Sequence, residues 1–281
     1  MRDDPSQAKP PGLPHSLPPP LMPRASTAAP EPATRCANCD RPIDGEAQRY
    51  CPACGQPTPA QRIGWRFLAR EIANGVLPAD RGFVHSLLRL FWKPGHFIRG
   101  YIHGRRAGFT KPQIMVTMTA AMLLLWSRFL LGSDPFPEVG NASGGAAAFE
   151  QGLTRWANSN FAVFSLLLLP VQAAAFRLVF PRTGGFSYPE WLAITALLIA
   201  QANVLWALLL PLQKWMPGAM AIITLVIVGC NTISLVQLFD VQSAWKTFWR
   251  SLAGYALYLL TYLLILSVIT VVAMAVLGYR A

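Results

Sequence analysis

Five long apolar segments constrain the fold of this chain more than any other feature of its sequence. They lie near residues 112–131, 160–180, 190–210, 218–239 and 252–278. A helix needs about 20 residues to cross a hydrocarbon core roughly 30 Å thick, and each segment approaches or exceeds that length. With 53% hydrophobic and 13% charged residues, the chain is too apolar for an ordinary globular domain. We therefore predict an all-α integral membrane protein with about five transmembrane helices.

Basic residues gather on one side of these predicted spans. Residues 62–111, just before the first span, carry ten basic and two acidic side chains. By alternation, the cations of the second and fourth loops lie on the same side as those before the first span. These cations are Arg105, Arg106, Lys111, Arg177, Arg182, Lys246 and Arg250. The positive-inside rule makes this side cytoplasmic, so we expect a multi-pass protein with its N-terminus in the cytoplasm.

Four cysteines precede the spans in a pattern typical of paired zinc knuckles. Cys36 and Cys39 form one C-x-x-C motif, and Cys51 and Cys54 form a second one after eleven intervening residues. Four thiolates close a tetrahedral site with no open position, so we expect a structural zinc ion that supplies most of the folding free energy of this small module. Gly55 allows the tight turn that aims backbone N–H groups at the sulfurs. An iron site of the rubredoxin type, a dithiol redox pair and two disulfides stay as alternatives, the disulfides being disfavoured in a reducing cytosol.

Composition divides the chain into four regions. Residues 1–34 hold ten prolines and few large apolar side chains, which indicates a disordered tail; a Pro-rich ligand for a groove-binding partner is the alternative. A small zinc ribbon occupies residues 35–57 and a basic amphipathic juxtamembrane segment occupies residues 58–111. The transmembrane helical domain follows over residues 112–281.

The juxtamembrane segment combines cations with apolar side chains at helical spacing. Arg62, Arg66 and Arg70 recur every fourth residue and predict a basic stripe on an amphipathic interfacial helix. Each cation beside an anionic leaflet contributes about 1 kcal/mol to membrane binding. We predict that the segment contacts anionic lipid or a protein partner through Arg62, Arg66, Arg70, His96, Arg99, Tyr101, Arg105, Arg106 and Lys111. A soluble three-helix cap that lies on the spans is the alternative arrangement.

The sequence holds no recognisable catalytic constellation, and we expect a protein that is not an enzyme. The four histidines fall in the tail or the juxtamembrane segment, without a nucleophile in a pattern that they could activate. His96 and His103 could hold a second metal or a headgroup phosphate, but Gly100 and Gly104 weaken the helix that would align them. The spans lack mid-membrane Asp, Glu, Lys and His, which ion relays usually contain. Their polar side chains are mainly neutral amides, which more often join helices: Gln172, Gln201, Asn203, Asn231 and Gln237.

Two stretches of the sequence resemble a bacterial family of unknown function. The first runs from Tyr50-Cys51-Pro52 to Cys54-Gly55-Gln56. The second runs from Pro94-Gly95-His96 through Tyr101-Ile102-x-Gly104-Arg105-Arg106 to Lys111-Pro112. Members of the family carry an N-terminal zinc ribbon, this juxtamembrane signature and several transmembrane helices. The resemblance implies a bacterial integral membrane protein with bound zinc, and it carries no established activity. With the predicted topology, we expect the protein in the inner membrane.

Two classes of function remain. In the first, the cytoplasmic zinc ribbon and the basic segment dock a protein partner or anionic lipid, while the spans act as anchor and assembly surface. In the second, the protein is a small-molecule, lipid or ion transporter whose pathway runs along the amides Gln172, Gln201, Asn203 and Asn231. A lipid-modifying enzyme built on His96, His103 and Arg105 is a weaker third idea. Nucleic acid is not an expected partner, because residues 35–56 balance three arginines with three acids. Homo-oligomer formation is left open.

Overall fold

The structure, a computed structural model, describes residues 35–44, 48–58, 60–73, 82–132, 134–136, 145–181, 185–216, 218–240 and 242–277. The predicted disordered tail and Arg182 lie outside these residues. Over the described ranges the chain is helical and contains no β-strand. Two isolated bridges, between Arg35 and Pro42 and between Tyr50 and Pro57, lie in the cysteine module. The predicted all-α class is confirmed.

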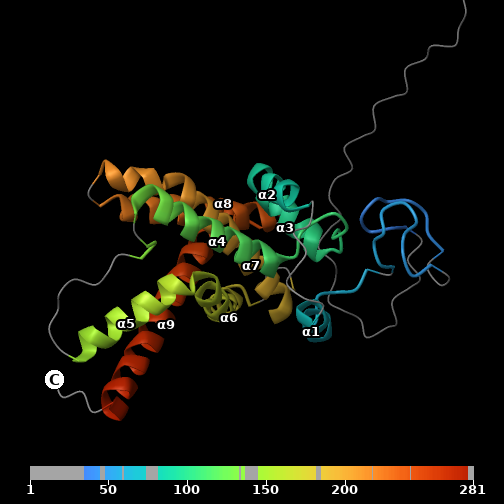
Figure 1. The fold of residues 1–281 in the computed structure, drawn as a ribbon. Coiled ribbons are helices and arrows are strands. Elements are labelled where there is room, and N and C mark those ends of the chain that lie inside the picture. The colour runs from blue at the N-terminus through green and yellow to red at the C-terminus, as the bar shows by residue number, and fades with distance from the viewer. Residues whose placement is uncertain are drawn as a thin grey trace, which may run out of the picture.

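Nine α-helices and one 3₁₀ helix follow one another in the described part of the chain (Figure 1). The short helices before the spans are α1 (Trp65–Ala73), α2 (Phe83–Trp92) and α3 (Pro94–Ile102). The next three are α4 (Pro112–Leu131), α5 (Gly145–Ser159) and α6 (Phe161–Val179). The last are α7 (Tyr188–Leu209), extended by η1 (Leu210–Lys214), then α8 (Ala219–Leu238) and α9 (Ala244–Leu277).

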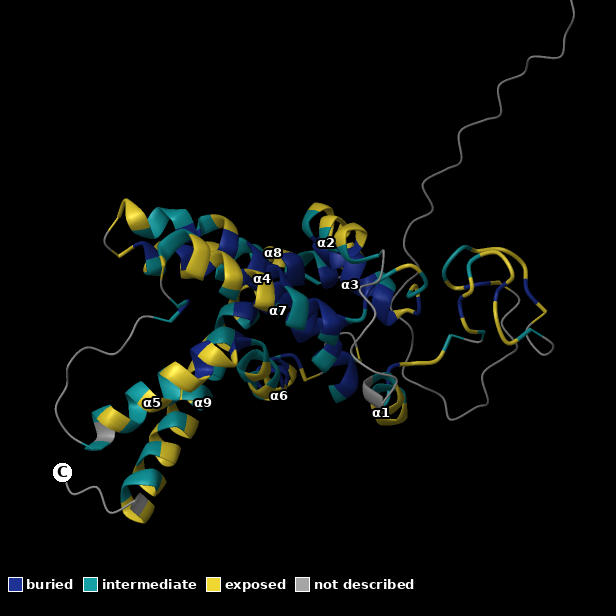
Figure 2. Cartoon of the chain, viewed as in Figure 1, coloured by how far each residue is buried: buried dark blue, intermediate teal, exposed yellow. Residues whose placement is uncertain are grey.

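Five helices are long and apolar enough to cross a membrane: α4, α6, α7 with η1, α8 and α9. Helix α7 is the central one, because it packs against α4, α6 and α8 and because 61% of its most apolar stretch is buried inside the molecule. Figure 2 shows this contrast between buried α7 and exposed α9. The predicted multi-pass membrane architecture is confirmed.

Helix α9 begins at Ala244, eight residues before the predicted start of the last span at 252. Its first turns carry Lys246 and Arg250. Hydropathy leaves these charged residues out of the predicted span, but both are good helix formers, so the helix begins before the span does. The 34 residues of α9 extend about 51 Å, more than the roughly 30 Å of a hydrocarbon core. The exposed aromatic rings of Trp245, Phe248 and Trp249 lie at this end, where an interfacial aromatic belt is expected.

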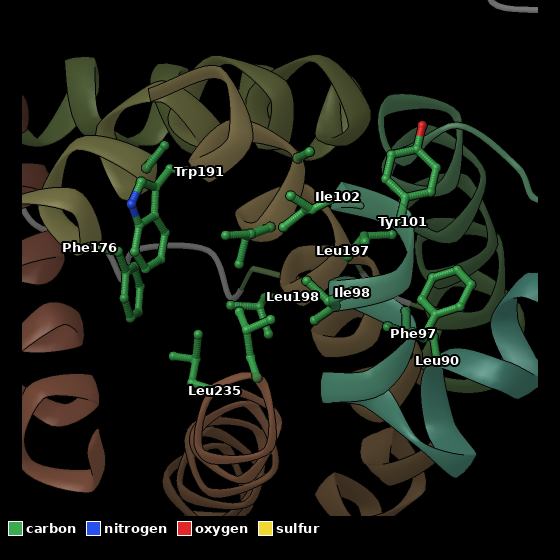
Figure 3. Packing of buried hydrophobic residues seen from close by; sticks show 14 of the residues in the cluster. Leu90, Phe97, Ile98, Tyr101, Ile102, Phe176, Trp191, Leu197, Leu198 and Leu235 are labelled. Atoms are coloured by element: carbon green, nitrogen blue, oxygen red, sulfur yellow. The ribbon is translucent and has the colours of Figure 1, made fainter. Parts of the chain in front are cut away.

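The end of the bundle that carries α1–α3 and the cysteine module is called the ribbon end. There α3 is part of the core: Phe97, Ile98 and Ile102 belong to the same buried cluster as Leu197 and Leu198 of α7 (Figure 3). The arrangement depends on Gly95, because a Cβ at this position would lie 2.3 Å from the Cβ of Gln237 on α8. The alternative of a helical cap lying on the spans therefore describes α3 better than a free interfacial helix does.

Candidate functional site

The four cysteines lie on two turns with the same backbone design. In the first turn the N–H of Asp40 donates to the carbonyl of Cys36 (2.9 Å), and in the second the N–H of Gly55 donates to the carbonyl of Cys51 (2.8 Å). The residue after each second cysteine has a positive φ, +59° at Asp40 and +70° at Gly55. Glycine adopts this conformation at low cost, and Asp is among the few other residues that tolerate it. The predicted role of Gly55 thus has a counterpart at Asp40, which the sequence did not single out.

The two turns bring all four Sγ atoms to within 4.8 Å of one another. Cys36 Sγ lies 3.6 Å from Cys54 Sγ, and Cys39 Sγ lies 3.6 Å from Cys51 Sγ. Zn–S bonds of about 2.3 Å in a tetrahedron place the sulfurs about 3.8 Å apart, so the cluster has the dimensions of a four-thiolate metal site. All four thiols are free, and the disulfide alternative is not realised. The residues therefore fit a bound metal ion.

Backbone N–H donors lower the pKa values of Cys39 and Cys51, whereas burial raises them. The N–H groups of Ala53 and Cys54 lower the pKa of Cys51 to about 7. At Cys39 a backbone N–H also favours the thiolate, but burial and hydrogen bonds to the other three sulfurs raise its pKa to about 12. Four neighbouring sulfurs do not all ionise together unless a cation neutralises them, which is the chemistry that a metal ion supplies.

The cysteine module is fixed to the loop between α3 and α4 by Gln56. The Oε1 atom of this buried side chain accepts hydrogen bonds from the backbone N–H groups of Ala107 (2.8 Å) and Arg106 (3.3 Å). Nearby, a Cβ at Gly104 would lie 2.7 Å from the Cβ of Ala60 and 3.6 Å from that of Ala37. The juxtamembrane signature is therefore the surface on which the module rests.

The predicted basic stripe on one helix is wrong in part, because Arg62 precedes α1 and turns toward α7. Its Nε lies 2.6 Å from Oε1 of Glu190, and its Nη2 donates to Oε2 of Glu190 (3.1 Å) and to the carbonyl of Gly185 (3.0 Å). Glu190 is buried and also accepts hydrogen bonds from the N–H and hydroxyl of Ser187, in a capping box. A buried carboxylate needs such partners, which explains why Arg62 leaves the stripe.

Two further residues predicted to contact lipid or a partner are interior. Arg99, 8% exposed, makes a bidentate ion pair with Asp240 at 2.7 Å on both arms and donates to the carbonyls of Gln237 and Leu238 at the end of α8. A cation at a helix C-terminus satisfies carbonyls that have no partner inside the helix. Tyr101 is 4% exposed and belongs to the core. Both residues hold the fold together, so neither is the freely exposed surface residue that the sequence suggested.

The other predicted contact residues lie at or near the surface of the ribbon end. Arg66, Arg70, His96 and Arg105 are exposed. His96 and His103 do not join any group of potential metal ligands among the described residues. Lys111 is partly buried, and its Nζ lies 2.9 Å from Oε1 of Glu71. Hydropathy did not identify Glu71 as a site residue, although it is one of only two acids between 62 and 111.

Arg106 lines a cleft of about 490 Å³ that opens between the cysteine module, α1 and the loop before α4. Its guanidinium lies 4.5 Å from the ring centre of Phe67, and its Nε donates to the carbonyl of Tyr101 (3.1 Å). Arg70, Glu71 and Lys111 line the same cleft. The cleft therefore combines three cations and one carboxylate with aromatic walls.

The amides of the spans are paired with neighbouring helices. Asn203 donates to the Thr119 hydroxyl (3.3 Å), and Asn231 donates to the Leu198 carbonyl (3.3 Å). Gln201 accepts a hydrogen bond from Ser234 (3.0 Å). These amides and Gln172 are buried, and none of them lines the cleft. Their contacts are those of residues that join helices.

One segment of the chain matches the model of a known protein family. Residues 80–124 match the model of a family described as "Protein of unknown function (DUF3667)". The matched segment contains α2, α3 and the first part of α4, and so includes the residues from Pro94 to Pro112. No curated protein and no solved structure matches the chain.

Proposed function

We propose that this chain is a non-catalytic, multi-pass protein of the bacterial inner membrane that docks its ribbon end on anionic lipid. The ribbon end faces the cytoplasm, and the cysteine module is a structural zinc ribbon. The spans anchor the protein, while the ribbon and the basic segment bind the anionic headgroups of the leaflet beside them.

Zinc is the metal that suits the four-cysteine cluster. The sulfur spacing agrees with tetrahedral Zn–S geometry, and four protein ligands leave no open position for a substrate or water. The ion holds the two turns together, and through Gln56 and Gly104 they rest on the α3–α4 loop. The metal therefore has a structural role in forming one wall of the cleft.

The balance of charge at the ribbon end is the observation that carries the docking proposal. Outside the cysteine module, each of the three described carboxylates of the ribbon end pairs with a cation: Glu71, Glu190 and Asp240. The side chains of five other cations make no ion pair or hydrogen bond with any described residue: Arg66, Arg70, Arg89, Lys93 and Arg105. Such cations contribute about 1 kcal/mol each beside an anionic leaflet.

A thermal-shift experiment on the purified full chain tests this proposal. Phosphatidylglycerol in mixed micelles should raise the melting temperature of the wild type more than phosphatidylcholine does, because a ligand of the folded state stabilises it. A variant with the five cations replaced by Gln should lose that difference. High salt should weaken it, since the Debye length falls from about 10 Å at 0.1 M to about 3 Å at 1 M. Equal shifts with both lipids in the wild type would contradict lipid docking and favour a protein partner.

A further inference from the structure

The basic cleft borders an apolar groove of about 340 Å³. Three residues line both cavities: Phe67 and Glu71 of α1, and Tyr101 of α3. The groove lies where α1 meets the spans α4, α6 and α7, and its walls are almost entirely apolar. The ribbon end therefore offers a polar compartment and an apolar compartment that meet along α1.

The charges of the cleft suit an anionic group. Glu71 pairs with Lys111 at 2.9 Å, which leaves the cations of Arg70 and Arg106 in excess. The Nη2 atom of Arg106 is buried and has no hydrogen-bond partner among the described residues. A buried guanidinium nitrogen without an acceptor is costly, and a rotation of the Arg106 side chain toward the cleft would give it a phosphate oxygen as acceptor.

The groove has the position and the surface that suit an acyl chain. Its floor on α7 is formed by Leu192, Ala193 and Ala196, where the two small side chains leave room. Ala196 lies eight residues after the start of α7 at Tyr188, which corresponds to about 12 Å along the helix. This depth is less than half of a hydrocarbon core roughly 30 Å thick, so the groove lies in the leaflet next to the cleft.

We propose that the cleft and the groove together bind one anionic phospholipid, with its phosphate at Arg70 and Arg106 and an acyl chain against α6 and α7. This inference rests on the proposed docking function and deepens it, since it names a single site within the basic surface. Recognition requires both parts of the ligand: the headgroup alone lacks the apolar contact, and a zwitterionic lipid lacks the net charge.

Native mass spectrometry of the detergent-purified, metal-loaded full chain tests the site. Three probes are added separately: phosphatidylglycerol, phosphatidylcholine with the same chains, and glycerophosphoglycerol, which is the headgroup without chains. The wild type should bind one phosphatidylglycerol at concentrations at which the other two do not bind. Equal binding of glycerophosphoglycerol would show a free-anion site and overturn the proposal.

Variants separate the two compartments. R70Q removes an exposed cation with no other partner and should weaken phosphatidylglycerol binding about tenfold, the effect of losing one charge-assisted hydrogen bond. A196F fills the floor of the groove and should weaken binding as well. Because Ala196 is buried, L166W at the half-buried wall on α6 provides a second test of the groove in case A196F does not fold. R105Q, which removes an exposed cation that does not line the cleft, is the matched control for R70Q and should bind as the wild type does.

The outcomes distinguish this site from docking in general. If a combined R66Q/R89Q/K93Q/R105Q variant loses lipid while R70Q, A196F and L166W keep it, surface docking stands and the single-lipid site is wrong. If none of these variants changes binding, both proposals are wrong. Loss with R70Q and with a folded groove variant, but not with R105Q, supports the site.

Discussion

At the scale of single residues, the ribbon end depends on a few polar side chains, each with a defined partner. The four cysteines face one another, Gln56 joins the module to the α3–α4 loop, and Arg62 reaches the buried Glu190. Each contact gives a buried or crowded group the partner that it requires. Replacing one partner should therefore affect the other in a measurable way.

Cys54→Ser should remove the metal and loosen the cysteine module while the spans stay folded. Serine does not replace a thiolate ligand, and three ligands do not close the tetrahedral site. Metal analysis should fall from about one ion per chain to near zero, with little change in far-UV circular dichroism because the module contains no described helix. Cys230→Ser, outside the cluster, is the control and should keep the metal. Retention of the metal by Cys54→Ser would contradict the four-ligand site.

Arg62 and Glu190 should be energetically coupled. Removing the arginine leaves a buried carboxylate with only its Ser187 partners, whereas Glu190→Gln keeps a side chain that suits a capping box. A double-mutant cycle of Arg62→Gln and Glu190→Gln in SDS-induced unfolding should give a coupling energy of about 1–2 kcal/mol, moderated by the exposure of Arg62. Simple additivity of the two effects would show that the pair does not contribute.

His103 should make stability depend on pH. Partial burial lowers the pKa of His103 below its ordinary value, so the folded chain favours the neutral ring. As pH falls below about 6.5, the unfolded chain binds more protons than the folded one, and stability decreases. The loss of melting temperature between about pH 7.5 and about pH 5.5 should be smaller in His103→Gln than in the wild type. Equal losses in the wild type and in His103→Gln would contradict this role.

The cysteine ligands could be predicted from the sequence because a C-x-x-C turn is a local structure. The partners of Arg62 and Arg99 could not, because Glu190 and Asp240 lie 128 and 141 residues further along the chain. Only the packing of α3 and α7 reveals that these arginines are structural. A basic residue before a span therefore has two explanations in the sequence, lipid contact and ion pairing, and only the fold decides between them.

At the scale of elements, α3 connects the ribbon end to the bundle. It ends in the loop that supports the cysteine module, and its N-terminus lies against the end of α8. Hydropathy correctly predicted five spans, since long apolar helices have a strong signal. It missed α5, whose Ala-rich sequence favours a helix without making it apolar enough for a span.

Gly95→Ala should disrupt the contact between α3 and α8. The new Cβ would lie 2.3 Å from the Cβ of Gln237 and 2.5 Å from backbone atoms of α8, so the helices would have to move apart. Overpacking of this kind costs about 1–3 kcal/mol or more. Gly100→Ala is a matched control on the same helix, because its Cβ would be 3.6 Å from the nearest atom, on the Arg105 side chain. The control should gain about 0.5–1 kcal/mol, and equal effects on SDS-induced unfolding would contradict the close approach.

At the scale of the whole molecule, the ribbon end and the far end of the bundle differ in charge and in construction. The ribbon end carries α1–α3, the cysteine module, the cleft and most of the described cations. The other end is reached by α5 and by the exposed C-terminal half of α9 (Figure 1). This asymmetry suits a protein that has one fixed orientation in the membrane and binds the headgroups of one leaflet.

Reporter fusions should show that orientation. With five spans and the ribbon end in the cytoplasm, a reporter after Ala281 should be active only outside the cytoplasm, and one fused before the cysteine module only inside it. Arg177 in the last turn of α6, and Lys246 and Arg250 in the first turns of α9, predict the same sidedness. Activity of both reporters in the same compartment would contradict the five-span topology.

Co-purification of metal and lipid tests the central claim most directly. The full chain and its Cys51→Ser/Cys54→Ser variant are purified in parallel, and zinc, phospholipid classes and proteins that elute with each are quantified. Because Tyr50, Gln56 and Pro57 of the module line the cleft, loss of zinc should open it. The wild type should carry one zinc and an excess of anionic phospholipid over the bulk membrane, and the variant should lose both. Anionic lipid that stays with the zinc-free variant, or a protein partner that is lost with the metal while lipid is unchanged, would contradict the account.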